Sequence, residues 1–282
     1  MPGKSPRVSR AESLHQQVAK NIRNQIAAGV LRDGQPLPST RELAERFDVS
    51  VFTINEAMKT LVADGVVVTK PRAGRVVNAP EQAEHTEVRT ESPHVLLVGG
   101  YAGSGKTELG RVLARETGWA ILDKDTLTRP VVEAALELLG CSPHDRESDD
   151  YVSRIRPREY EALIHAMTEN VQCGNSAIVT APFMKEFKDV AWLNRLQATC
   201  AAMNAKITFV WVHCDVDTMH TYIRQRGAAR DSYKLENWDS YTDSIDVGFR
   251  PPVPHATIDN SASGAPLQTQ ARDLVSRVVS QG

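Results

Sequence analysis

The sequence predicts two domains of different fold class, a small α+β domain followed by a larger α/β domain. In residues 1–80, three segments with apolar residues at helical spacing are followed by two short strand-like segments. From residue 93 to residue 282, five short apolar segments alternate with helix-periodic ones, which is typical of a parallel sheet buried on both faces. Residues 81–92 contain almost nothing apolar and are predicted to form a solvated linker.

Charge is divided between the same two parts of the chain. Residues 1–80 carry 12 Lys and Arg against 7 Asp and Glu, whereas residues 81–282 carry 21 against 28. The basic part favours an anionic partner. The four cysteines stand far apart without a C-x-x-C pair, so neither a zinc site nor a disulfide framework is suggested. No stretch approaches the roughly 20 apolar residues that span a bilayer, and we expect a cytoplasmic protein with no membrane partner.

The three N-terminal helical segments are bounded by typical start and stop residues. The first covers about 13–28 and ends at Gly29, the second begins after Ser39 or Thr40, and the third ends at Gly65. Strand-like residues 66–69 and 75–78 then flank a short turn, which predicts a β-hairpin. Two short helices on a tight turn with a hairpin behind them make a winged helix-turn-helix.

This part resembles the DNA-binding domain of the GntR family of bacterial transcription regulators. The resemblance covers residues 13–78 and depends on the stretch 34–44 (GQPLPSTRELA), on Val49-Ser50 and Thr53-Ile54, and on the hairpin. It implies that Arg41 and the third helix enter the major groove of operator DNA while the hairpin touches the minor groove or the backbone. The candidate DNA contacts are Ser39, Thr40, Arg41, Ser50, Thr53, Asn55, Lys59, Arg72, Gly74 and Arg75.

Two positions depart from the commoner GntR pattern. Val51 and Asn55 stand where arginine is frequent in the family, which leaves the operator sequence open. Asn55 either reads an adenine through its amide or is simply solvated.

A phosphate-binding loop is predicted between the first strand and the first helix of the second domain. Residues 100–107 (GYAGSGKT) match the pattern G-x-x-x-x-G-K-[ST], in which glycines let backbone N–H groups face phosphates. Lys106 would reach the β- and γ-phosphates and the Thr107 hydroxyl would hold Mg²⁺, so ATP and Mg²⁺ are the predicted cofactors. The predicted nucleotide-binding residues are Gly100, Ala102, Gly103, Ser104, Gly105, Lys106, Thr107, Glu108 and Arg226.

Residues 93–280 resemble the small P-loop kinases, especially the zeta-toxin-like, gluconate-kinase-like and chloramphenicol-phosphotransferase-like branch. Beyond the loop, the resemblance depends on Asp123-x-Asp125, Arg158-x-Tyr160, residues 181–183 and the arginines at 224, 226 and 230. It implies that Asp125, or else Asp123, accepts the proton of a substrate hydroxyl. It also implies that Arg224 and Arg230 stabilise the transferred phosphoryl group and that Arg158 and Tyr160 face the substrate. The alternative for each of these charged residues is a solvated turn or helix face.

Two functions from different classes follow. In the first, the protein is a transcription regulator that binds an operator as a homodimer or higher oligomer and senses ATP or another nucleotide. In the second, it is an ATP-dependent small-molecule kinase, or a weak ATPase, that regulates its own promoter. Because the linker is polar, we expect any coupling between the two sites to run through the dimer. The phosphate acceptor, the nucleotide preference and the sign of regulation remain open.

Overall fold

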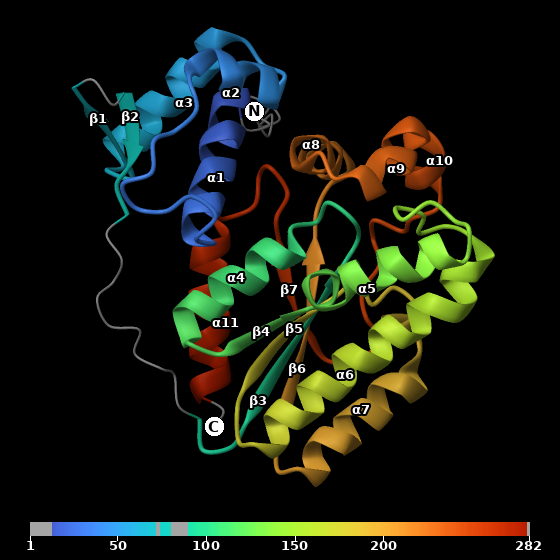
Figure 1. Ribbon diagram of the computed structural model, residues 1–282. Coiled ribbons are helices and arrows are strands. Elements are labelled where there is room, and N and C mark those ends of the chain that lie inside the picture. The colour runs from blue at the N-terminus through green and yellow to red at the C-terminus, as the bar shows by residue number, and fades with distance from the viewer. Residues whose placement is uncertain (1–12, 72–73, 80–89, 281–282) are drawn as a thin grey trace, which may run out of the picture.

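The computed structural model describes residues 13–71, 74–79 and 90–280, and of Arg230 it describes the backbone alone. Helices α1 (Leu14–Ala27), α2 (Thr40–Phe47) and α3 (Val51–Ala63) precede the antiparallel strands β1 (Val67–Lys70) and β2 (Gly74–Val77). The serines at the helix starts act as caps: Ser39 Oγ accepts the Glu42 N–H at 3.3 Å and Ser50 Oγ accepts the Thr53 N–H at 3.1 Å. These elements confirm the predicted winged helix (Figure 1).

The second domain is built on a parallel sheet, as predicted. Its five strands are β3 (His94–Gly100), β4 (Ala120–Asp123), β5 (Ala177–Thr180), β6 (Lys206–His213) and β7 (His255–Asp259), in the spatial order β4-β5-β3-β6-β7. Since parallel strands end at the same edge, the loops after β3 and β4 come together there.

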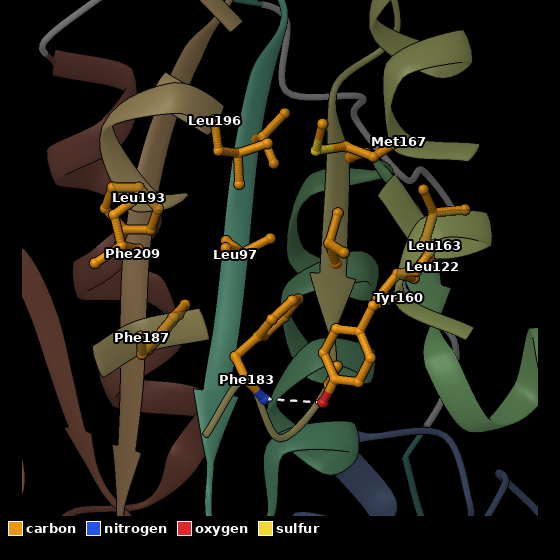
Figure 2. Packing of buried hydrophobic residues seen from close by; sticks show 14 of the residues in the cluster. Leu97, Leu122, Tyr160, Leu163, Met167, Phe183, Phe187, Leu193, Leu196 and Phe209 are labelled. Carbon is orange, nitrogen blue, oxygen red and sulfur yellow. Dashed lines mark hydrogen bonds between the residues drawn. The ribbon is translucent and has the colours of Figure 1, made fainter. Parts of the chain in front are cut away.

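Helices cover both faces of this sheet. Helices α4 (Lys106–Thr117) and α11 (Leu267–Ser280) pack on one face around Leu96, Val98 and Val210. Helices α6 (Arg156–Gln172) and α7 (Val190–Ala202) pack on the other, where Figure 2 shows Leu163 and Leu193 among the buried side chains around Leu97. Strand residues buried on both faces explain why the strands are continuously apolar.

Shorter helical segments connect the main elements of the second domain. Helix α5 runs over Lys124–Leu138 and is capped by the Asp123 carboxylate, which accepts the Thr126 N–H at 3.0 Å. A π-helical turn (Tyr151–Ile155) leads into α6 from the acidic segment 140–150. Helix α8 (Val216–Arg226) is followed by a 3₁₀ turn (Ala229–Asp231) and by the short helices α9 (Ser232–Glu236) and α10 (Trp238–Asp243). A second 3₁₀ turn (Glu186–Lys188) precedes α7.

Helix α1 belongs to two apolar cores. Val18, Ile22 and Ile26 pack inside the winged helix. At its C-terminal end, Ala28 joins the buried cluster beneath α4 and α11 of the other domain. Figure 1 shows α1 standing against α4 and α11. The first helix of the small domain is therefore also a packing element of the large one.

The described helices include none long and apolar enough to cross a membrane.

Candidate functional site

The loop between β3 and α4 has the backbone that phosphate binding requires. Gly103 and Gly105 have φ angles of 80° and 89°, and a Cβ added at Gly105 would overlap the Asn260 amide. The Lys106 ammonium donates to the Tyr101 carbonyl at 2.7 Å. Lys106 is also the first residue of α4, a helix of 12 residues whose N-terminal N–H groups and dipole favour an anion. Among the buried side-chain nitrogen and oxygen atoms of the described residues, Ser104 Oγ is the one without a hydrogen-bond partner. This donor set fits a polyphosphate.

The Asp123 carboxylate lies beside the phosphate loop. Its Oδ2 atom accepts hydrogen bonds from the hydroxyls of Thr107, at 2.8 Å, and Thr180, at 2.6 Å. A hydroxyl and a carboxylate are hard oxygen ligands of the kind that Mg²⁺ takes alongside phosphate oxygens and water. The described residues hold no cluster of three His, Cys, Asp or Glu that could bind a metal. Thr107 and Asp123 would be the protein ligands of Mg²⁺ here.

A cavity of about 340 Å³ opens from the loop toward Asp123 and Asp125. The buried Lys124 ammonium contacts Glu159 Oε1 at 2.6 Å and Asp125 Oδ1 at 3.0 Å, and so holds the Asp125 carboxylate at the cavity. Burial, reinforced by the neighbouring Glu159 carboxylate, raises the pKa of the Tyr151 phenol, which donates to Glu159 Oε2 at 2.7 Å. The cavity also has cationic walls, formed by Arg146, Arg156, Lys185, Arg226 and Lys234.

Only one residue of the predicted Arg158-x-Tyr160 pair faces this cavity. Tyr160 lines it and its hydroxyl accepts the Phe183 N–H at 3.3 Å (Figure 2). Arg158 is 77% exposed, pairs with Glu161 at 2.6 Å and is absent from the cavity lining. Arg156 lines the cavity instead, 4.2 Å above the Tyr160 ring and 2.9 Å from Glu186. Positions two apart on a helix point to nearly opposite sides, which separates the two arginines.

The predicted lid arginines also diverge. Arg226 lines the cavity and pairs with Asp231, its Nε donating at 2.9 Å. Arg224 points toward the winged helix, where its Nη1 donates to Asp48 Oδ2 at 3.0 Å. The backbone of Arg230 lies in the 3₁₀ turn, and its side chain falls outside what the structure describes.

Three candidate DNA-contact residues meet on the winged helix. Arg75 of β2 donates to Thr40 Oγ1 and to Asn55 Oδ1, both at 3.1 Å, and so joins the hairpin to α2 and α3. Arg41 is exposed beside them, at the start of α2.

The other candidate DNA contacts lie nearby in the fold or outside the described ranges. The hydroxyls of Ser39, Ser50 and Thr53 are held in cap hydrogen bonds, and Lys59 pairs with Glu56 at 2.7 Å. Gly74 begins β2 with a φ of 71°, and Arg72 lies outside the described residues.

Sequence reasoning missed the contacts that connect the two domains. The Asn260 amide donates to the Ser104 carbonyl of the phosphate loop at 3.0 Å, and its Oδ1 accepts from Asn24 of α1 at 3.5 Å. The buried Lys20 ammonium of α1 donates to the carbonyls of Ser261 and Gly264, both at 2.6 Å. In the sequence, Lys20 and Asn24 look like the solvated face of an amphipathic helix, so no local signal would have revealed them.

Comparisons with known proteins give a family match for each of the two domains. Residues 14–77 match the family described as bacterial regulatory proteins, gntR family, and residues 95–247 match the AAA domain family. Shikimate kinase of Moorella thermoacetica is 31% identical over 104 residues, which are 36% of this chain and 58% of that enzyme. The transcriptional repressor NagR of Bacillus subtilis is 32% identical over 71 residues, which are 25% of this chain and 29% of the repressor. The chain thus spans less than two thirds of either relative.

Solved structures resemble the two parts separately. A gluconokinase from Sinorhizobium meliloti is 15% identical, with a TM-score of 0.44 over 68% of this chain and 97% of that one. YtrA from Sulfolobus acidocaldarius, a GntR-family transcription factor, is 35% identical, with a TM-score of 0.24 over 25% of this chain and 74% of that one. From the two family matches, the chain belongs to the AAA domain family over more than half of its length, and its residues 14–77 form a domain of the gntR family of bacterial regulatory proteins.

Proposed function

We propose that this protein is a transcription regulator that binds operator DNA as a dimer and senses ATP, or another nucleotide, at its phosphate loop. The observation that carries the proposal is the hydrogen-bond path from Asn24 of the winged helix through Asn260 to Ser104 of the loop. A nucleotide that changes the conformation of the loop would move Asn260, whose side chain is hydrogen-bonded to both Ser104 and Asn24.

Helix α2 offers a second connection between the sites. Its N-terminal Thr40 contacts Arg75 on the DNA-binding face, and Asp48, directly after its last residue, pairs with Arg224 of α8. A helix of eight residues moves as one piece, so a shift of α8 would change the position of Arg41. Two sites that bias the same element are coupled, and each ligand then changes the affinity for the other by the same factor.

Operator titrations with no nucleotide, with ATP and with ADP, all with Mg²⁺ at one salt concentration, test this function. We expect ATP to change operator affinity by roughly 5- to 150-fold. Lys106→Ala should abolish the change and leave nucleotide-free operator binding intact, because Lys106 lies at the phosphate loop. Three superimposable curves for the wild type would contradict nucleotide sensing.

The cavity next to Asp125 supports a kinase as the second candidate function. It adjoins the phosphate loop and is lined by Arg146, Arg156 and Lys185, which suits an acceptor that carries both a hydroxyl and an anionic group. Asp125 would accept the hydroxyl proton while Lys106 and Arg226 neutralise charge on the transferred phosphoryl group. An ADP-release assay with such acceptors distinguishes the two candidates. Release that no acceptor stimulates would rule against the kinase.

A further inference from the structure

A second cavity lies between the winged helix and the phosphate loop. Its volume is about 250 Å³. One wall comes from the loop and its helix, through Gly103, Gly105 and Glu108, and the opposite wall comes from the winged helix, through Asn21, Gln25 and Arg46. Side chains of the winged helix therefore form part of the cavity lining.

The two cavities meet at the phosphate loop, since Lys106, Thr107 and Arg226 line both. A polyphosphate bound along the loop has one end beside Thr107 and Asp123, where the cation ligands and the Asp125 carboxylate lie. Its other end must then leave on the far side of the loop. That side opens into the cavity beneath the winged helix.

Resting on the proposed nucleotide sensing, we propose that the nucleoside of the bound nucleotide occupies this interdomain cavity and contacts Gln25 and Arg46 of the winged helix. Amide groups donate and accept hydrogen bonds at once, as the edge of a base requires, and a guanidinium stacks on an aromatic ring. Gln25 donates to Asn21 Oδ1 at 2.5 Å, and Tyr222 of α8 lines the same cavity. The amide wall is thus held in place before any ligand binds.

This placement makes the DNA-binding domain part of the nucleotide site. A ligand that contacts both domains binds more tightly when the winged helix packs against the phosphate loop than when the two are apart. This difference in affinity would shift the protein toward the packed arrangement. The phosphates alone would lack that preference, because they contact the large domain.

The test compares ATP with inorganic tripolyphosphate, both with Mg²⁺, by calorimetry on the full chain. We expect the wild type to bind ATP more tightly than tripolyphosphate. Gln25→Ala and Arg46→Ala should each weaken ATP relative to tripolyphosphate by about 5- to 10-fold, the usual effect of one lost hydrogen bond. Glu45→Ala is the matched control, because Glu45 is exposed on the same helix as Arg46 and is not part of the cavity lining.

Each outcome separates this inference from the function on which it rests. If the wild type binds tripolyphosphate as tightly as ATP, or if both variants keep the wild-type ratio of affinities, the cavity does not hold the nucleoside, while the phosphate site stands. If the wild type binds neither compound, the nucleotide-sensing proposal fails and this inference fails with it. Retained tripolyphosphate binding in the variants shows that the fold has survived the substitution.

Discussion

At the scale of single residues, Glu108 is a titratable group that lines the proposed nucleoside cavity. It follows the phosphate loop in the first turn of α4, and burial raises its pKa from 4.5 to about 7, against the opposing effect of Arg111. The folded protein therefore holds this proton more tightly than the unfolded chain between these two pH values. Stability contributed by the protonated group is present below pH 4.5 and is lost as the pH rises toward 7.

Replacing Glu108 by glutamine should remove that loss. We expect Glu108→Gln to match the wild type near pH 5 and to exceed it in stability by about 1 to 3 kcal/mol at pH 8, since one pKa unit corresponds to about 1.4 kcal/mol. Urea unfolding at the two pH values measures the difference. A stability gain that is the same at both would show that the carboxylate is not the cause.

At the scale of elements, α1 makes polar contacts to the second domain through Lys20 and Asn24. Lys20 is 5% exposed and is held by two carbonyl groups of the loop after β7. Removing its ammonium leaves both carbonyls without this donor, at a cost of about 1 to 3 kcal/mol if they stay buried. The apolar side of α1 would be unaffected, because Val18 and Ile22 pack inside the winged helix.

We therefore expect Lys20→Met to uncouple the two sites. Nucleotide-free operator binding should stay close to the wild type, whereas the effect of ATP on operator affinity should fall several-fold. Operator titrations with and without ATP measure this, and Arg195→Met, at a 68% exposed position of α7, is the control. Undiminished coupling in Lys20→Met would instead favour the route through a dimer that the sequence suggested.

At the scale of the whole molecule, the sequence predicted what depends on local patterns. The winged helix and the parallel sheet follow from apolar periodicity, and the phosphate loop follows from eight consecutive residues. Asp123 and Thr107 could be expected to meet, since both follow parallel strands that end at the same edge.

Contacts that depend on the rotation of a helix about its axis, or on the packing of the two domains, could not be predicted from the sequence. The choice between Arg156 and Arg158 requires the rotation of α6, which is set by how Leu163 and Met167 pack on the sheet. Lys20 and Asn24 contact residues of the second domain, Ser261 and Asn260, that lie more than 200 positions further along the chain. Their burial is a property of the assembled molecule, so no window of sequence contains it.

Because α1 packs in the winged helix and also against the second domain, cutting the chain between the domains would remove contacts from both parts. A cut in the linker would allow Lys20 to separate from the Ser261 and Gly264 carbonyls and Ala28 from the apolar cluster of α4 and α11. Each piece would therefore lack contacts that are present in the intact protein. Because the winged helix and the P-loop domain share α1, operator and nucleotide binding have to be tested on the undivided chain.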